Sequence, residues 1–242
     1  MGDHPVAWLR SRTNMGPDTL LAITEYGMSL QASLAAIQNA VPCDRAGALN
    51  ALVTQAIECS RQTQPLQTGD EGPNFILSDA RGSATALRAL LLEGPAVIVF
   101  CRGSWCPYCS AELAAYQLAL PAITARGANL VAISPEIRDD SLTDNEIDAL
   151  DFEVLSDPGN LTARKFGLVY ALDSESRAQF EAFGLNLEAA NGDASWRLPI
   201  PATFLIDNDR SIVFASAEPD YRQRAEPADV VAALDNLSGR DG

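Results

Sequence analysis

Two cysteines three residues apart, Cys106 and Cys109, form the motif with the clearest chemistry in this sequence. They lie between an apolar run typical of a buried strand (residues 96–100) and a run typical of a helix (residues 111–120). The first turn of a helix offers unpaired N–H groups and a partial positive charge, and both stabilise a thiolate relative to a thiol. At this spacing the second sulfur can attack the first and close a disulfide. The motif therefore indicates a redox enzyme that works through a dithiol.

The residues around the pair fit that chemistry. Pro107 fixes φ and suits the first turn of a helix, so we expect Cys106 at the helix start and Cys109 one turn later. The first cysteine of such motifs is usually the exposed, attacking sulfur, and the second is the less exposed, resolving sulfur. Arg102 can lower the pKa of a nearby thiol through its positive charge. Trp105 is expected to shield the pair from one side.

Two other interpretations of the pair are a structural zinc site and two ordinary buried thiols. A closed zinc site needs four ligands, but the only histidine is His4, and Cys43 and Cys59 fall in a predicted helical segment. Cys101 directly follows the predicted strand and is expected to be a core thiol. The strand-to-helix junction favours the redox pair over both alternatives, and we expect neither a metal nor a cofactor. A single histidine also excludes Ser-His-Asp and Cys-His catalysis.

The composition limits the partners and the compartment. The 242 residues carry a formal net charge of −15, which repels phosphate backbones and anionic lipid, so neither nucleic acid nor a membrane is an expected partner. No run of eighteen apolar residues suggests a spanning helix. The N-terminal residues lack a basic region followed by an apolar one, and five cysteines do not fit a secreted disulfide framework. We therefore expect a cytoplasmic protein.

An N-terminal extension, residues 1–62, precedes the segment that contains the dithiol. Asp18 is expected to cap a helix that runs to about Asn39, because apolar residues recur there three and four positions apart. Pro42 ends this helix, and Asp44 can cap a second one that continues to about residue 57. The two predict a helical hairpin, which either packs on the main domain or mediates a homodimer.

A polar linker over residues 62–73 leads into the main domain, residues 69–242. Apolar runs predict strands at 75–77, 96–100, 130–133, 152–155, 203–206 and 212–214. Helical patterns fall at 87–92, 106–125, 141–150, 161–166, 174–191 and 227–237. Strands that alternate with helices predict an α/β sheet, and the final hairpin adds an antiparallel edge.

Three segments carry a family resemblance: residues 69–79, residues 100–109 with the dithiol, and residues 198–207. Together they resemble the alkyl hydroperoxide reductase / thiol-specific antioxidant family, the peroxiredoxin-like branch of the thioredoxin fold. Residues 220–229 resemble that branch too. The resemblance implies a thioredoxin-like mixed sheet flanked by helices. It also implies a cis peptide between Ile200 and Pro201 that faces the dithiol, with the backbone of Ile200 pairing with an incoming substrate or partner chain. From the residues alone, Pro201 would be trans.

The sequence departs from typical peroxiredoxins at three positions. Their signature is Pro-x-x-x-Thr-x-x-Cys. When its cysteine is placed at Cys109, Arg102 occupies the proline position and Cys106 the threonine position. Pro201 replaces an arginine that many members hold just before the strand. These replacements weaken the expectation of efficient peroxide reduction, and Cys-Pro-Tyr-Cys matches thioredoxins and glutaredoxins instead.

The resemblance therefore implies a thiol-dependent antioxidant oxidoreductase that reduces peroxides. Cys109 or Cys106 would become a sulfenic acid, its neighbour would close the disulfide, and thioredoxin or glutathione would reduce it. The alternative is a thiol-disulfide oxidoreductase without real peroxidase activity, in which Cys106 attacks a protein or small-molecule disulfide. A third possibility is a binding module that keeps the fold without the chemistry.

Overall fold

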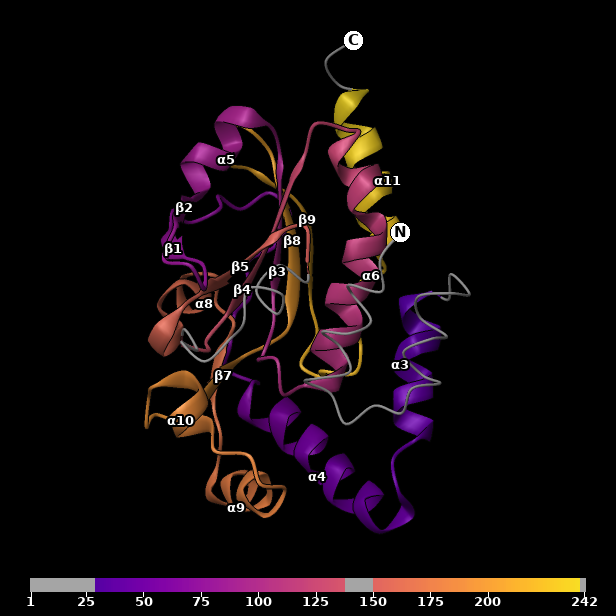
Figure 1. The fold of residues 1–242 in the computed structure, drawn as a ribbon, viewed down its shortest axis with the longest axis vertical. Coiled ribbons are helices and arrows are strands. Elements are labelled where there is room, and N and C mark those ends of the chain that lie inside the picture. Colours follow the sequence, from indigo (N-terminus) through magenta and orange to yellow (C-terminus); the bar gives the residue numbers. More distant parts are fainter. Residues whose placement is uncertain (1–28, 138–149, 240–242) are drawn as a thin grey trace.

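The computed structural model describes residues 29–137 and 150–239. Its centre is a mixed sheet with the strand order β2-β1-β5-β4-β3-β8-β9 (Figure 1). β4 is parallel to β3 and β5, and the other neighbours are antiparallel. The strands are β1 (Ile76–Ser78), β2 (Ala84–Ala86), β3 (Ala96–Phe100), β4 (Asn129–Ser134), β5 (Glu153–Ser156), β8 (Ala202–Ile206) and β9 (Ile212–Ala217). The predicted mixed sheet is confirmed, and each of the six predicted strands is present within a few residues.

A second, two-stranded sheet joins β6 (Val169–Ala171) to β7 (Arg197–Pro199) in antiparallel register. The helices of the domain are α5 (Leu87–Glu93), α6 (Pro107–Thr124), a 3₁₀ turn η1 (Pro158–Asn160), α8 (Leu161–Lys165), α9 (Ser174–Ala182), α10 (Leu187–Asn191) and α11 (Pro227–Ser238). The predicted helix at 141–150 falls almost entirely outside the described residues. The segment 174–191 is mostly helical, as predicted, and it forms two helices, α9 and α10. Gly184, with φ of 78°, separates α9 from α10 because a left-handed glycine ends a helix.

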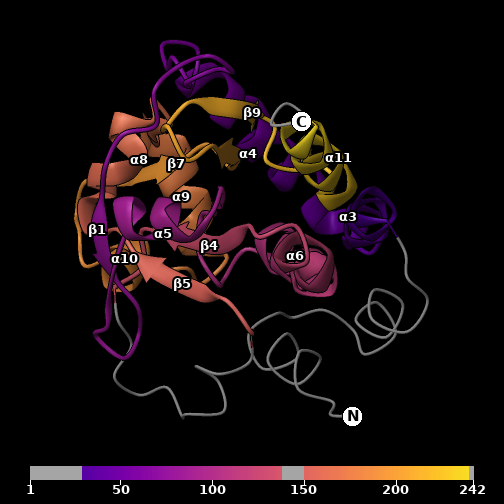
Figure 2. The same ribbon diagram turned by 90° about the horizontal axis from the view of Figure 1, so that it is seen from above.

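β3 lies in the interior of the sheet, with every side chain buried, and this accounts for its unbroken apolar sequence. It is joined to its parallel neighbour β4 through α6, which packs with α11 on one side of the sheet (Figure 2). α5 and α8 lie on the opposite side. Phe100, Phe166 and Phe204 are fully buried, and their ring centroids lie 4.9–6.0 Å apart. This aromatic cluster fixes the end of β3, from which the chain enters the dithiol loop.

Two N-terminal helices, α3 (Leu30–Asn39) and α4 (Cys43–Cys59), pack on this domain. α3 contacts α6, whereas α4 contacts α9 and β6 (Figure 1). A single helix over residues 18–39 is wrong, because the non-helical Ser29 caps α3 by accepting a hydrogen bond from the backbone N of Ala32. The predicted cap Asp18 lies outside the described residues. The division into an extension (1–62) and a domain (69–242) stays a prediction.

A carboxylate from the other end of the chain also holds the start of α3. The backbone N–H groups of Leu30 and Gln31 donate to the two oxygens of Glu226, at 3.0 and 2.8 Å. The Gln31 side chain donates to the carbonyl of Arg224 at 2.6 Å. Negative charge at a helix N-terminus is favourable, so the segment before α11 anchors α3.

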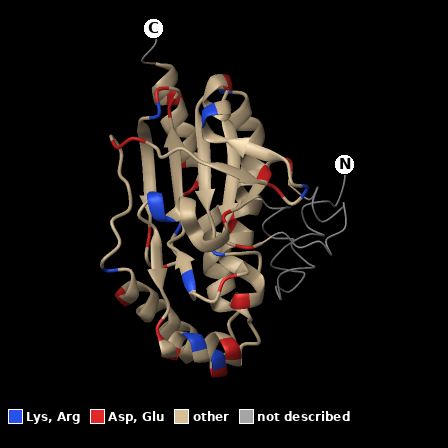
Figure 3. Ribbon diagram, turned by 90° about the vertical axis from the view of Figure 1, so that its left-hand side faces the viewer, with Lys and Arg blue, Asp and Glu red and all other residues tan. Residues whose placement is uncertain are grey.

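Lys, Arg, Asp and Glu residues lie mostly in the loops and helices around the sheet, and the central strands contain few of them (Figure 3). Within the described ranges, no helix is long and apolar enough to cross a membrane. The same ranges hold no group of three or more His, Cys, Asp or Glu side chains placed to bind a metal ion.

Candidate active site

The start of α6 positions the dithiol. Cys106 is the N-cap of α6, and Pro107 is its first residue, where the missing N–H costs no hydrogen bond. Cys109 lies one turn further along. The loop before the helix closes tightly, because the backbone N of Cys106 donates to the carbonyl of Gly103 at 3.2 Å. Gly103 has φ of 143°, and a Cβ there would come within 2.3 Å of the Trp105 indole nitrogen, so this turn requires glycine.

The expectation that Cys106 is an exposed sulfur is wrong. Cys106 is 2 % exposed and Cys109 is 1 % exposed. Trp105 and Tyr221 lie close by, and the Trp105 ring packs edge-on against Phe180 of α9, with centroids 5.6 Å apart. The dithiol is therefore buried more deeply than the sequence suggested, because α9 packs against Trp105 on that side.

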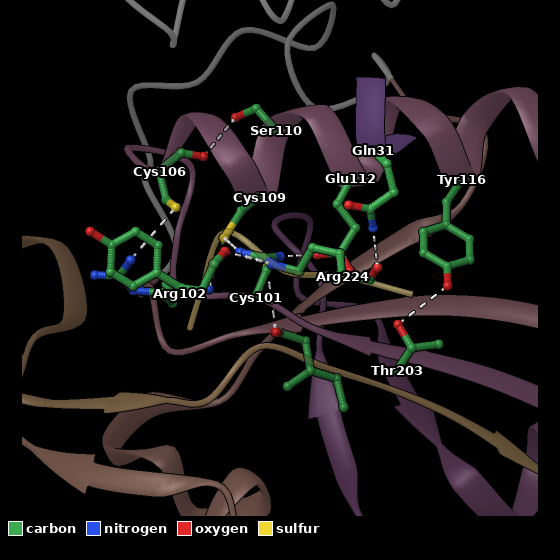
Figure 4. Close-up of polar contacts among 12 residues, drawn as sticks. Gln31, Cys101, Arg102, Cys106, Cys109, Ser110, Glu112, Tyr116, Thr203 and Arg224 are labelled. Carbon is green, nitrogen blue, oxygen red and sulfur yellow. Dashed lines mark hydrogen bonds and ion pairs between the residues drawn. The ribbon is translucent and has the colours of Figure 1, made fainter. Parts of the chain in front are cut away.

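Arg102 directs its positive charge at the dithiol (Figure 4). Its Nη1 lies 4.0 Å from the Sγ of Cys106, and its backbone N–H donates to the Sγ of Cys109 at 3.3 Å. The side chain is buried, and its guanidinium lies 4.0 Å from the centroid of the Tyr221 ring and 5.0 Å from that of Trp105. No carboxylate among the described residues pairs with it. The Cys106 sulfur is therefore placed to serve as its counter-charge.

These surroundings shift the pKa values of the two thiols in opposite directions. Burial alone would raise the pKa of Cys106. A hydrogen bond from Cys109 and the charges of Arg102 and Arg224 outweigh burial and lower this pKa to about 6. Burial raises the pKa of Cys109 well above its usual range, and the hydrogen bond to Cys106 raises it further. At neutral pH the pair is therefore a Cys106 thiolate that accepts a hydrogen bond from the Cys109 thiol.

A buried ion pair lies beneath Cys109 (Figure 4). The Nη1 of Arg224 bonds to an oxygen of Glu112, and its Nη2 lies 3.5 Å from the Sγ of Cys109. The Nε of Arg224 donates to the carbonyl of Tyr221 at 2.9 Å. Burial raises the pKa of Glu112 to about 7, although the charge of Arg224 acts in the opposite direction. This ion pair was not predicted from the sequence. The available signal was a glutamate three positions after a cysteine in an otherwise uncharged helix.

A cavity of about 330 Å³ adjoins the first cysteine. Cys106, Arg102, Trp105 and Pro107 line one part of it, and Cys109 does not line it. The remaining walls come from α3, α4, α9 and the segment around Tyr221. A small molecule in this cavity would therefore meet Cys106 before Cys109.

Ile200 and Pro201 do not take the roles that the resemblance implied. The structure has no cis peptide among its described residues, so the predicted cis bond between them is wrong. Their trans bond keeps the chain extended between β7 and β8, as most X–Pro bonds do. Ile200 is fully buried, and its backbone N already donates to the carbonyl of Leu168 at 2.8 Å. Neither residue lines the cavity, whereas the other five predicted site residues gather there or directly beneath it.

The low pKa of Cys106 has a testable consequence in the Cys109→Ser variant, whose serine hydroxyl can still donate a hydrogen bond. We expect the rate of Cys106 alkylation by iodoacetamide to rise with pH and to level off above an inflection near 6, because the thiolate is the reactive form. Mass spectrometry would follow each cysteine separately, with the exposed Cys43 as the internal reference. An inflection at the ordinary cysteine value of about 8.5 would contradict the proposed environment.

Comparisons with known proteins identify the family and the fold. Residues 68–215, more than half of the chain, match the family model of the AhpC/TSA family. A protein of Mycobacterium tuberculosis (strain H37Rv) named as a peroxiredoxin is 28 % identical over 155 residues, which cover 64 % of this chain and 87 % of that protein. The thiol-disulfide oxidoreductase ResA of Bacillus anthracis is 24 % identical over 152 residues, 62 % of this chain and 69 % of ResA.

Solved structures show the same fold. The crystal structure of peroxidoxin BcpB from Mycobacterium tuberculosis superposes with a TM-score of 0.55 at 23 % identity, covering 71 % of this chain and 98 % of that one. A yeast mitochondrial 1-Cys peroxiredoxin superposes with a TM-score of 0.54 at 19 % identity, covering 73 % and 78 %. With a thioredoxin-like fold, a buried dithiol at a helix start and a family match over most of the domain, the chain belongs to the AhpC/TSA family and is a thiol-dependent oxidoreductase.

Proposed function

We propose that this protein is a thiol peroxidase in which Cys106 attacks the peroxide and Cys109 resolves the product. The observation that supports it is the asymmetry of the pair. Cys106 lines the cavity and has a pKa of about 6, whereas the pKa of Cys109 is raised and its sulfur lies away from the cavity. A sulfur that is 2 % exposed is also accessible to a small peroxide far more readily than to a folded protein.

The first step is attack of the Cys106 thiolate on one oxygen of the peroxide. An S–O bond forms and the O–O bond breaks; the sulfur is oxidised to sulfenic acid, and the second oxygen leaves as an alcohol or water after taking a proton. Arg102, 4.0 Å from this sulfur, can stabilise negative charge that develops on the leaving oxygen. Trp105 and Pro107 line the cavity beside this sulfur.

The second step is attack of Cys109 on the sulfenic sulfur. An S–S bond forms, the S–O bond breaks, and water leaves with the proton of Cys109. Arg224, 3.5 Å from Cys109, can stabilise the thiolate that this step needs. Two electrons from thioredoxin or glutathione then reduce the disulfide by thiol exchange.

A thiol-disulfide oxidoreductase is the second candidate, because the separated pKa values of a Cys-x-x-Cys pair suit that reaction as well. ResA, one of the relatives, carries that name. In this reaction Cys106 would attack a disulfide and release one thiolate. Cys109 would then displace the second thiolate and leave the same intramolecular disulfide.

Hydrogen peroxide added to the reduced wild type, Cys106→Ser and Cys109→Ser tests the assignment. In Cys109→Ser we expect sulfenic acid on Cys106, trapped by dimedone and located by mass spectrometry, because the resolving thiol is absent. The wild type should form the intramolecular disulfide instead, and Cys43→Ser, which removes an exposed cysteine, should behave like the wild type.

Two outcomes would contradict the proposal. Sulfenic acid that forms on Cys109 in Cys106→Ser at the wild-type rate would reverse the two roles. A protein that leaves peroxide untouched but forms a mixed disulfide with a small disulfide in Cys109→Ser would be the oxidoreductase.

The cellular setting belongs to the same proposal. A cytoplasmic location would supply the thiol reductant that the cycle consumes, because thioredoxin and glutathione keep that compartment reducing. We also propose the division into an N-terminal helical extension (1–62) and a thioredoxin-like domain (69–242). Size-exclusion chromatography with light scattering would decide whether the extension mediates a homodimer.

A further inference from the structure

The cavity beside Cys106 has walls that the family match does not cover. The match begins at residue 68, whereas α3 and α4 end before residue 60. The apolar lining residues from this N-terminal part are Ile37, Val41, Ala46, Leu49, Leu52 and Val53. Phe180, Phe183 and Leu185, on and just after α9, face the same cavity. Cys106 therefore lies at one side of a chamber whose wall on α3, α4 and α9 is mostly apolar, with Gln38, Asn39 and Asn50 as its polar residues.

The size of this chamber exceeds what hydrogen peroxide needs. A water molecule occupies about 30 Å³ of liquid, and hydrogen peroxide is only slightly larger, whereas the cavity holds about 330 Å³. Cavities that bind small organic molecules begin at roughly this volume and are mostly apolar with a few polar groups. The chamber fits a substrate with an apolar body better than it fits hydrogen peroxide.

Two buried polar atoms of the chamber that lack a partner in the described part of the chain belong to residues of the dithiol loop. Arg102 and Trp105 line the chamber, and each has a buried side-chain nitrogen, Nε and Nε1 respectively, without a protein acceptor among the described residues. Buried donors without acceptors are rare, and a polar substrate group can satisfy them. An amphipathic ligand with one oxygen-bearing end therefore fits with that end toward Cys106 and its apolar end toward α4 and α9.

We propose that α4 and α9 form the binding site for the apolar body of an organic hydroperoxide, and that Leu49 on α4 is a specificity-determining residue. This inference rests on the proposed peroxidase function. Contact with the apolar wall would hold the hydroperoxide group beside the Cys106 thiolate, whereas hydrogen peroxide gains nothing from that wall. The N-terminal extension would then select the substrate for a reaction carried out by the family domain.

Leu49→Trp tests the site, because the larger indole would fill part of the cavity beside α4. Thr54→Trp is the matched control, since Thr54 is exposed on the same helix and does not line the cavity. We expect Leu49→Trp to lower kcat/KM for cumene hydroperoxide by about tenfold or more. The main effect should be a higher KM, because the substrate loses apolar contacts that contribute to binding. Its kcat/KM for hydrogen peroxide should stay near that of the wild type, and Thr54→Trp should change neither value.

A second measurement needs no peroxidase activity. Cumyl alcohol, the product of that reaction, should slow iodoacetamide alkylation of Cys106 in the wild type and in Thr54→Trp but not in Leu49→Trp. Absence of protection in the wild type, or equal losses for both peroxides in Leu49→Trp, would overturn the inference while peroxidase function stands. Protection without reduction of either peroxide would overturn the proposed function and leave the binding site in place.

Discussion

Replacing Glu112 by alanine is expected to destabilise the protein by about 3–5 kcal/mol, a large part of the usual stability of a domain. Both side chains of the Glu112–Arg224 pair are 1 % exposed, so the variant would leave a guanidinium buried without its counter-charge. The measurement is the urea midpoint at pH 8, where a carboxyl with a pKa of about 7 is mostly ionised in the wild type.

The double variant Glu112→Leu/Arg224→Met separates the charge effect from packing. Replacement of a buried ion pair by apolar residues of similar size is often neutral or stabilising, so the double variant should recover most of the lost stability. In this double variant Cys109 should attack the sulfenic acid on Cys106 more slowly than in the wild type, because Arg224 no longer lies beside the Cys109 sulfur. Equal stability of wild type and Glu112→Ala would contradict the pair as a stabilising contact.

Replacing Arg102 by methionine is expected to slow the reaction of Cys106 with hydrogen peroxide at neutral pH by about tenfold or more. Loss of a cation this close raises a thiol pKa by about 1–3 units, so less of the sulfur would be thiolate. Methionine has a similar length and remains compatible with the aromatic surroundings of Tyr221 and Trp105. Stopped-flow rates across pH would show both the slower reaction and the displaced inflection.

Arg102→Lys is the matched control, because lysine keeps the charge but not the planar donor group. We expect the pH inflection of its reaction with hydrogen peroxide to stay close to that of the wild type. The rate of this reaction should lie between the rates of the wild type and of Arg102→Met. A methionine variant whose profile still inflects near 6 would assign the low pKa of Cys106 to the hydrogen bond from Cys109 and to Arg224 instead.

The parts of the fold that were predictable carry strong local patterns. The run at 96–100 is apolar without a break because β3 is buried on both faces, and Pro107 marks the start of α6. The small sheet of β6 and β7 had no such signal, since each strand has three residues and Val169 pairs with Pro199, thirty positions away. The end of α9 could have been predicted from the sequence, because Gly184 can adopt the left-handed conformation that terminates a helix.

The residues of the candidate site were likewise predictable only where they lie close together in the sequence. The dithiol and Arg102 were found because they are close together in sequence. The burial of Cys106 was missed because α9 and Tyr221, which arrive from distant parts of the chain, help to cover it. Arg224 was missed for the same reason, since 112 positions separate it from Glu112.

The anchoring of α3 by Glu226 has a consequence for how the protein is made. These contacts join residues 195 and 196 positions apart, and Arg224, in the same segment, lies 112 positions after Glu112. Ribosomal synthesis must therefore continue far beyond α6 before Glu112 can meet its partner or α3 can be anchored. Contacts of such long sequence separation raise the contact order of the fold, and high contact order slows folding. The dithiol helix can be complete in the nascent chain well before the charge that stabilises its second sulfur arrives.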